Sequence, residues 1–370
     1  MHSHPKAYYI AYCQSVNVIF SQHCYPYTHR AIISFMKVSE LGEFGLIKLL
    51  EKTVAGSRHP SPAWQRLLIG IGDDAAAWKS DGSVQLATTD TMVQDVHFSL
   101  ASTNFTDLGW KALAVNVSDI AAMGGQPEYA LVTLALPGDT QAEDMVALYQ
   151  GMMEVGNRCG VALVGGDIVR APQLGLTITV LGSATKRVLL TRSAARQGDK
   201  VAATNYLGNS AGGLKMLQKG LKLDDETTAL LKQVHLRPMP RVEEGKLLVN
   251  QRVKAAIDIS DGLVADLGHI GERSGVAAII HIEQLPIHPR LKAAFPEEYL
   301  GLALSGGEDY ELLFTAPAKV VQKVQRAAAC PITVIGEIVS GKPGQVTVLD
   351  TKGNSFPLDK KGWDHFAVRS

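Results

Sequence analysis

The sequence lacks an excess of charge of either sign, because 36 lysines and arginines balance 36 aspartates and glutamates over 370 residues. A nucleic-acid-binding protein usually carries a basic excess, so that class is not expected. The sequence also lacks an apolar run of the roughly 20 residues that span a bilayer. With 46% hydrophobic residues, it is typical of a soluble chain with room for two domains. We therefore expect a cytoplasmic protein with no nucleic-acid or membrane partner.

Cysteine is scarce, and two of the four cysteines, Cys13 and Cys24, lie in the first 35 residues. This stretch has neither helical nor strand periodicity. It also lacks a basic segment followed by a sustained apolar core, which argues against a secretory signal. Its histidines match no zinc-finger spacing. Because Met36 precedes a well-patterned segment, we expect residues 1–36 to be an extension, either a disordered tail or the product of an upstream start.

One carboxylate stands near the end of a predicted helix, in the stretch AVNVSDIAAMGG at 114–125. Apolar residues recur at helical spacing before it, and the two glycines supply a stop. Asp119 therefore lies near the negative pole of the helix dipole, where an anion is disfavoured unless something positive compensates it. A metal ion would compensate it, with Asn116 as a second oxygen donor. The alternative is a solvated aspartate at a helix end.

Most other acidic residues of interest follow a predicted strand or a glycine turn. Strands are expected at 84–89, 129–136, 161–164, 176–181, 201–204, 255–258 and 311–315, and helices at 142–159 and from about 263 to 275. Polar groups at the carboxyl ends of such strands line ligand crevices in α/β proteins, and glycines let the backbone approach a phosphate. The residues at these places are Asp73, Asp74, Thr88, Thr89, Asp90, Asp167, Asp258 and Asp261.

These carboxylates indicate a cation site. Asp258 interrupts an apolar strand, where an unpaired carboxylate is costly, and few lysines or arginines lie within the loops. Hard oxygen ligands without cysteine indicate several Mg²⁺ ions, which suit a reaction that joins two phosphate-bearing molecules. Neither a P-loop nor a kinase glycine loop with its lysine strand is present, so a nucleotide site must be of another kind. Either Ser260 or Asp261 could instead cap the following helix.

A set of long motifs extends across the chain. GIGDDAA, TTDTMVQDVHF, KALAVNVSDIAAMGG, GGD, LTRSAARQGD, AIDISDGL, HLRP and LSGGEDYELLF follow in this order. From about Glu40 to Phe366 the sequence resembles the thiamine-monophosphate kinase family of the PurM-like ATP-binding superfamily. The resemblance implies an α/β (α+β) fold with PurM-like domains at 37–185 and 186–370, in a homodimer whose N-terminal sheets form a barrel. It also implies ATP-dependent phosphorylation of thiamine monophosphate to thiamine diphosphate.

Position by position, the resemblance implies three sets of ligand contacts. The substrate phosphate is already ionised, so no general base is assigned, and Asp90, Asp119 and Arg192 would assist the transfer. Two alternatives remain: a related enzyme that phosphorylates an amide or acyl oxygen and then dehydrates it, and a non-catalytic nucleotide or Mg²⁺-binding module. The implied contacts are Asp74, Thr88, Thr89, Asp90, Asp119, Asp167, Asp258 and Asp261 for Mg²⁺; Gly166, Asp167, Arg192 and Ser260, with Tyr149 as a further candidate, for ATP; and His97, Glu308 and Trp363 for thiamine monophosphate.

Overall fold

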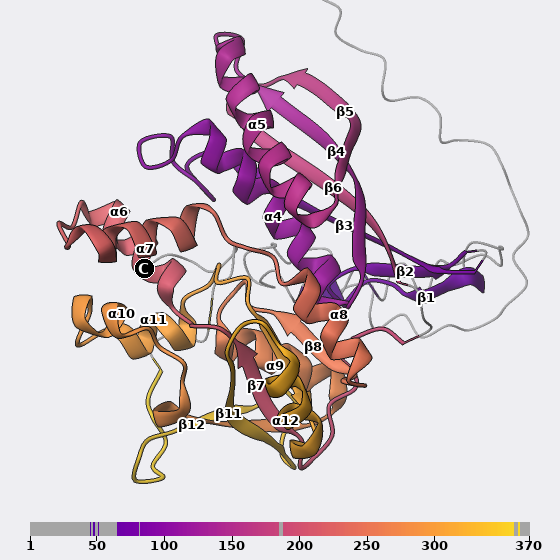
Figure 1. Ribbon diagram of the computed structural model, residues 1–370, viewed down its shortest axis with the longest axis vertical. Helices are drawn as coiled ribbons and strands as arrows, with labels where there is room; N and C mark the ends of the chain where they lie inside the picture. Colours follow the sequence, from indigo (N-terminus) through magenta and orange to yellow (C-terminus); the bar gives the residue numbers. More distant parts are fainter. Residues whose placement is uncertain are drawn as a thin grey trace, which may run out of the picture.

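Two six-stranded sheets, each with helices packed beside it, form the molecule (Figure 1). The computed structural model describes residues 45, 47, 48, 51, 65–80, 82–184, 188–358 and 362. The predicted extension at 1–36 and Trp363 lie outside the described residues. No helix in the described part of the chain is long and apolar enough to span a membrane.

The first sheet comes from the N-terminal half, in the strand order β1-β2-β3-β6-β4-β5. One face is covered by α4 and α5, and Trp110, Leu113, Leu148 and Ile178 lie in the core between them. Only β4 and β5 are parallel, because α5 connects them as a crossover. The elements are β1 (Leu67–Ile69), β2 (Ala76–Lys79), β3 (Val84–Val93), α4 (Phe105–Ala122), β4 (Gln126–Leu136), α5 (Ala142–Cys159), β5 (Ala162–Arg170) and β6 (Gly175–Ala184).

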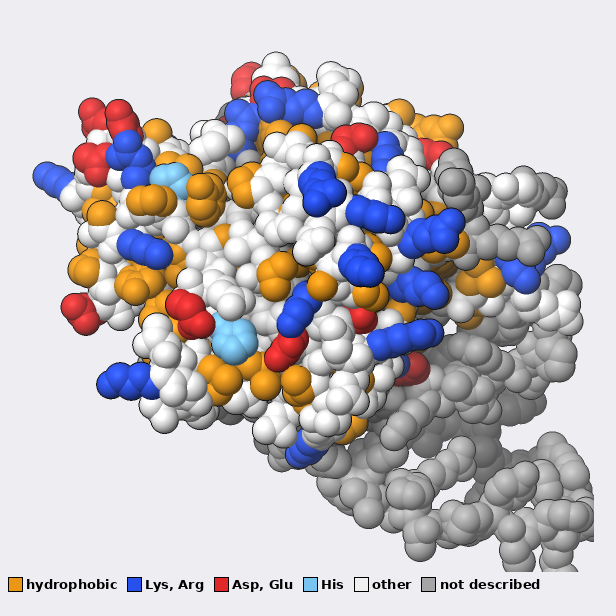
Figure 2. Space-filling view, turned by 60° about the horizontal axis from the view of Figure 1, so that its bottom comes forward, with side chains coloured by type: hydrophobic (Ala, Val, Ile, Leu, Met, Phe, Trp, Pro, Cys, Tyr) orange, Lys and Arg blue, Asp and Glu red, His pale blue; other side chains and the backbone are white. Residues whose placement is uncertain are grey.

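The second sheet comes from the C-terminal half, in the strand order β12-β9-β11-β7-β10-β8. On the face shown in Figure 2, lysine and arginine side chains are prominent and the visible acidic side chains are scattered. The elements are β7 (Lys200–Thr204), α6 (Asn209–Lys219), α7 (Asp225–Leu236), α8 (Val242–Asn250), β8 (Ala255–Asp258), α9 (Leu263–Ser274), β9 (Ala277–His281), η1 (Ile282–Gln284), α10 (Pro289–Ala294), α11 (Tyr299–Ser305), β10 (Leu312–Ala316), α12 (Ala318–Ala327), β11 (Ile332–Val339) and β12 (Val346–Leu349).

The helix that carries Asp119 ends where the sequence predicts. α4 stops at Ala122, and Gly124 takes the left-handed conformation with φ +71°. Asp119 therefore lies in the last turn, and α4 has no basic residue in that turn. The predicted helix at 142–159 matches α5, and α9 likewise ends before a left-handed Gly275.

Two predicted loop positions lie inside strands instead. β3 does not end near Thr89 but pairs with β6 through Val93, so side chains alternate across the sheet along its whole length. Gly165–Asp167 is likewise part of β5 and not a loop. A Cβ on Gly166 would lie 1.8 Å from the carbonyl oxygen of Val132, and its φ is +154°, so only glycine fits this strand position.

Candidate functional site

Three carboxylates from three separate elements meet where the two halves of the molecule join. Asp74 lies in the turn between β1 and β2, Asp119 in the last turn of α4, and Asp258 at the end of β8. One oxygen atom from each carboxylate lies within 4.8 Å of the others. Asp74 and Asp258 are buried, and Asp119 is partly exposed. We call these three residues the acidic cluster.

Neighbouring hydroxyl groups orient two members of the acidic cluster. Thr88 Oγ1 donates a hydrogen bond to Asp119 Oδ2 at 2.6 Å, and Ser118 Oγ donates to Asp258 Oδ2 at 2.6 Å. Because Thr88 comes from β3 and Ser118 from α4, the carboxylates are held by rigid elements rather than by flexible loops.

Arg192 forms an ion pair with the acidic cluster. Arg192 Nη2 lies 2.6 Å from Asp74 Oδ1, and Arg192 Nε lies 3.3 Å from Asp74 Oδ2. The backbone N–H of Arg192 also faces the carboxylate of Asp73 at 3.3 Å. Burial opposes the charge of Arg192, but Asp74 and Asp73 hold its pKa above the ordinary value. Arg192 therefore compensates the Asp73–Asp74 side of the site.

Asp119 and Asp258 carry more negative charge than their surroundings balance. Desolvation, followed by the charges of Asp90, Asp258 and Asp74, raises the pKa of Asp119 well above its usual range. Desolvation and Asp74 raise the pKa of Asp258 to about 8. Carboxylates that repel one another in this way favour either protonation or a bound cation. The arrangement of acidic oxygens, without sulfur, fits Mg²⁺.

Other residues predicted for the Mg²⁺ site have different roles or positions. Asp90 is near enough for its charge to raise the pKa of Asp119. Its backbone N–H donates to Asn116 Oδ1 at 2.9 Å, so the oxygen of Asn116 holds β3 against α4 instead of serving as the predicted second metal donor. Thr89 Oγ1 donates to the carbonyl oxygen of Ile178 at 3.1 Å. Its side chain lies on the opposite face of β3 from Thr88.

Asp167 and Gly166 are not brought to the acidic cluster within one chain. The register runs from Asp90 on β3 through Ile178 on β6 and Val132 on β4 to Gly166 on β5. Three strand spacings separate the ends of this row, about 14 Å along the sheet. Asp167 is exposed on an edge strand.

A second group of charged residues surrounds Glu308. Lys111 Nζ lies 2.7 Å from Glu308 Oε1, and His235 Nδ1 lies 3.5 Å from Oε2. Burial opposes the ionisation of Glu308, but Lys111 above all, together with His97, holds its pKa below the ordinary value. Burial and Lys111 lower the pKa of His235 to about 3, so it is neutral near pH 7. Glu308 therefore stays a carboxylate, and His97 lies close enough to act on it.

Sequence reasoning missed residues that connect the two groups. Tyr310 has its pKa raised by burial and then by Glu308, Asp90 and Asp258, so its hydroxyl lies near both groups of acids. Lys111, at 4% exposure, is a buried lysine within α4. A lysine inside the apolar stretch before Asp119 is the signal that could have revealed this contact, because buried lysines need a partner.

The turn between β8 and α9 contains Ser260 and Asp261, and neither caps the helix. The N-cap is Gly262, which supplies no side-chain hydrogen bond. Asp266, in the first turn of α9, reaches back to the turn instead. Gly262 leaves room that a side chain would not, because a Cβ there would lie 2.9 Å from the backbone of Ser305.

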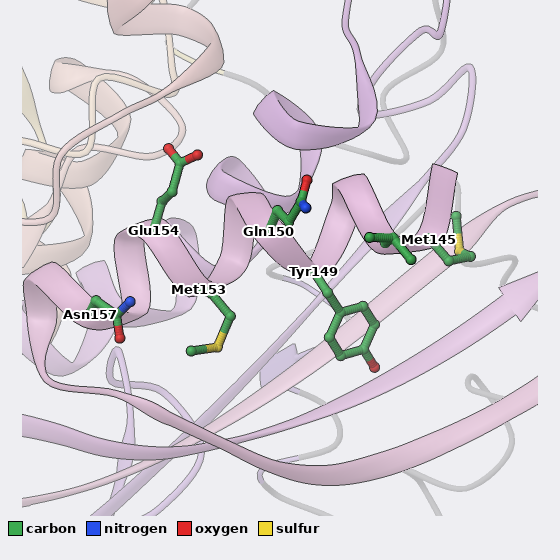
Figure 3. Close-up of a pocket in the computed structure, with 7 residues that line it drawn as sticks. Met145, Tyr149, Gln150, Met153, Glu154 and Asn157 are labelled. Carbon is green, nitrogen blue, oxygen red and sulfur yellow. The ribbon is translucent and has the colours of Figure 1, made fainter. Parts of the chain in front are cut away.

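Tyr149 lies apart from the acidic cluster, in a cavity of about 640 Å³ on α5 (Figure 3). Gly362, the described residue before Trp363, lies against the turn of Asp261, since a Cβ on Gly362 would be 2.9 Å from the carbonyl oxygen of Asp261. The cavity beside Tyr149 is lined by Met145, Val146, Tyr149, Gln150, Met153, Glu154 and Asn157, none of which belongs to the acidic cluster.

Comparison with known families places both halves of the chain. Residues 72–184 match the model of the AIR synthase related protein N-terminal domain, and residues 196–349 match that of the C-terminal domain. These matches, together with the two sheets, define a mixed α/β protein with the two-domain PurM-like fold.

Individual relatives that align with most of the chain show which family within this class it resembles. Thiamine-monophosphate kinase of Bacillus subtilis (strain 168) is 40% identical, over 80% of this chain and 93% of the relative, and that of Escherichia coli (strain K12) is 39% identical, over 88% and 99%. The structure of AaThiL complexed with AMPPCP and TMP is 35% identical with a TM-score of 0.78, over 90% of this chain and 99% of that chain. The chain belongs to the thiamine-monophosphate kinase family.

Proposed function

We propose that this protein transfers the γ-phosphoryl group of ATP to the phosphate of thiamine monophosphate, giving thiamine diphosphate and ADP. The observation that carries the proposal is the acidic cluster beside the Glu308 group at the junction of the two halves. The relatives named for this reaction, and a related structure complexed with AMPPCP and TMP, support the same substrates. Since ATP is the co-substrate, we also propose a cytoplasmic location.

The residues proposed to hold Mg²⁺ are the acidic cluster, Asp90 and the hydroxyl of Thr88. When bound, Mg²⁺ would neutralise and align the phosphates that must approach one another. The role of the chain is to present these oxygens in a fixed arrangement, since Thr88 and Ser118 orient Asp119 and Asp258. Asp261, in the neighbouring turn, is proposed as a further ligand.

The transfer needs no general base from the protein. An oxygen of the substrate phosphate is ionised near neutral pH and forms the new bond to the γ-phosphorus, while the bond to the oxygen of the departing ADP breaks. Arg192 supplies positive charge beside the reacting groups, and Ser260 a hydroxyl contact for ATP. Direct in-line transfer without a phosphorylated enzyme residue follows, because alignment and charge account for the catalysis.

The Glu308 group is proposed to bind thiamine monophosphate. The thiazolium ring is cationic, and Glu308 is held as a carboxylate by Lys111. His97 lies beside it, with Nδ1 accepting a hydrogen bond from the backbone N–H of Val93 at 3.0 Å, which fixes the ring. Trp363 would offer an aromatic face to the cationic ring of the substrate. The position of Gly362 beside Asp261 supports the assignment of Trp363 to the site.

A homodimer with a barrel formed from two N-terminal sheets is also proposed. Several apolar side chains of β4 and the edge strand β5 are exposed, which is unusual for a monomer of this kind. Gly166 and Asp167 lie on β5, so we assign them to a part of the ATP site separate from the acidic cluster. The exposed apolar residues are Tyr129, Leu131, Val164, Ile168 and Val169.

An Ile168→Asp variant tests the dimer. Ile168 is 66% exposed, so the charge should leave the single chain folded. We expect the variant to sediment at half the mass of the wild type. Val146→Asp, on the exposed side of α5, is the matched control. A variant that keeps the wild-type mass would contradict the proposed barrel.

For the organisation of the chain, we propose domains at 37–185 and 186–370, with 1–36 as an extension. A protein that starts at Met36 should be as active and stable as the full chain. Loss of folding in this truncated protein would refute the proposal.

The reaction itself is tested by incubating the protein with ATP, Mg²⁺ and thiamine monophosphate, with free thiamine as the control acceptor. We expect ADP and thiamine diphosphate in equal amounts, and only from the monophosphate. ADP released with an amide or acyl acceptor would indicate a related dehydrating enzyme. Binding of ATP without turnover of any acceptor would indicate a binding module.

A further inference from the structure

A single carboxylate oxygen holds the turn between β8 and α9. Asp266 Oδ2 accepts hydrogen bonds from the backbone N–H groups of Ser260, Asp261 and Gly262, at 3.1, 3.2 and 3.1 Å. Asp266 is 1% exposed, so water does not compete for this oxygen. Three hydrogen bonds to one buried oxygen restrict the backbone on both sides of Asp261.

The other side of this turn is fastened to the loop that carries Glu308. The backbone N–H of Glu308 donates to the carbonyl oxygen of Ser260 at 2.8 Å, and that of Tyr310 donates to Ile259 at 2.9 Å. A Cβ on Gly307 would lie 2.2 Å from the Ser260 carbonyl oxygen, so the two backbones are in close contact. The turn therefore lies between Asp266 and the Glu308 loop with little room to move.

The start of α9 does not by itself explain this carboxylate. One ligand atom each of Asp261, Asp266 and His269 lies within 4.8 Å of the others, so Asp266 is buried beside another acid. Such a placement is electrostatically unfavourable. The N–H groups that Asp266 accepts from precede Leu263, the first helical residue, and a Cβ on the N-cap Gly262 would lie 2.9 Å from the backbone of Ser305, so no side-chain cap fits there. What Asp266 uniquely supplies is the geometry of the turn.

We propose that Asp266 is a positioning residue for the nucleotide side of the reaction. It sets the backbone of Ser260 and Asp261, which contact ATP and Mg²⁺, while its own Oδ2 faces the turn. The inference rests on the proposed function for the assignment of these two residues. Its consequence is that loss of Asp266 weakens nucleotide binding more than it weakens binding of thiamine monophosphate.

The test measures equilibrium binding of AMPPCP with Mg²⁺ to the full chain by calorimetry. For Asp266→Ala, which removes the acceptor, we expect the Kd to rise by at least about tenfold, since three backbone N–H groups lose their acceptor. For Asp266→Asn, which keeps one acceptor oxygen and the shape, we expect a rise of about threefold. The KM for ATP should rise in parallel, and the KM for thiamine monophosphate should change by less than about twofold.

Asp199 provides the matched control, because it is a buried turn aspartate outside the site. It is 8% exposed, and its Oδ2 accepts a hydrogen bond from the backbone N–H of Arg196 at 3.0 Å. Asp199→Ala should lose thermal stability and keep the wild-type Kd. Wild-type Kd values in both Asp266 variants would overturn the proposal. If Asp266→Ala does not fold, the Asp266→Asn result decides, and an unchanged Kd overturns the proposal.

The same measurements separate this inference from the proposed function. A wild type that binds AMPPCP with Mg²⁺ but does not phosphorylate thiamine monophosphate would refute the function, and weaker binding by Asp266→Ala would still support the positioning role. Absence of AMPPCP binding by the wild type would overturn both.

Discussion

The acidic cluster and the loop at Gly307–Glu311 are equally rich in carboxylates, but the carboxylates have different hydrogen-bond and ion-pair partners. In the loop, Glu311 accepts hydrogen bonds from Arg241 at 2.7 and 2.5 Å, and Asp309 accepts from the backbone N–H groups of Gly208 and Ser210. Glu308 has its own lysine. In the acidic cluster, Asp119 and Asp258 accept hydrogen bonds from hydroxyl groups, and in the described part of the chain the ion pairs of Arg192 are with Asp74 and Asp73 instead.

Apart from Glu308, which is proposed to bind the substrate, this difference separates acids that stabilise the fold from acids that are suited to bind a ligand. Removing the charge of a buried carboxylate that has a cation or several donors leaves those partners buried and uncompensated, which is strongly destabilising. Carboxylates that face one another with only neutral donors remain strained until a cation or a proton arrives. Removing a charge from the acidic cluster should therefore reduce activity, whereas removing a charge from the loop should reduce stability.

The largest expected effect is on activity, in Asp119→Asn. The variant keeps the shape of the side chain and loses the charge that would hold Mg²⁺, so we expect kcat/KM to fall by at least about 1,000-fold, or roughly 4 kcal/mol. The melting temperature should not decrease, because repulsion within the acidic cluster is relieved. Asp139→Asn, at an exposed position, is the control. A variant with a near-normal rate would show that Asp119 does not hold the metal.

The next effect is on stability, in Glu311→Gln. This change leaves the buried guanidinium of Arg241 without its charge partner, which should cost about 3 kcal/mol in the free energy of unfolding. Urea unfolding measures this loss, and kcat per folded molecule should stay close to that of the wild type. A stable variant with low activity would remove the distinction between the loop and the acidic cluster.

A smaller effect on the free energy of unfolding is expected from changes in pH and from Mg²⁺. The pKa of Asp258 is about 8 in the folded protein against an ordinary 3.8, so the folded chain holds a proton that the unfolded chain releases. Without Mg²⁺, the contribution of Asp258 to stability should therefore fall as pH rises from about 4 to about 8. Mg²⁺ at about 100 times its Kd should add about 2.7 kcal/mol at the upper end of this range.

Melting temperatures across this pH range, with and without MgCl₂, measure both effects. In Asp258→Asn, stability in the absence of Mg²⁺ should decrease less with rising pH than it does in the wild type. The same pH dependence in Asp258→Asn and the wild type in the absence of Mg²⁺ would contradict the raised pKa of Asp258.

The sequence predicted several structural features around the candidate site, and its omissions have physical causes. The end of α4 was predictable because helical spacing and a glycine stop are local signals, and Asp258 because a charge in an apolar strand is conspicuous. The continuation of β3 through Asp90 was not, since it depends on pairing with β6, which is distant in the chain. The ion pair of Arg192 with Asp74 joins residues 118 positions apart, so no local pattern reveals it.

The smallest effect tests the alternation of β3, where two adjacent threonines point to opposite faces. Thr88→Val removes the hydroxyl that orients Asp119, so we expect kcat to fall about tenfold, or roughly 1.4 kcal/mol. Thr89→Val removes a hydroxyl that bonds to the neighbouring strand on the other face, and kcat should change by less than about twofold. Valine fills the same volume at both positions, so steady-state kinetics of the pair compares the faces directly. Equal losses of kcat at the two positions would mean that the face of β3 does not determine whether a threonine contributes to catalysis. The proposed Mg²⁺ site would then have to include both hydroxyl groups.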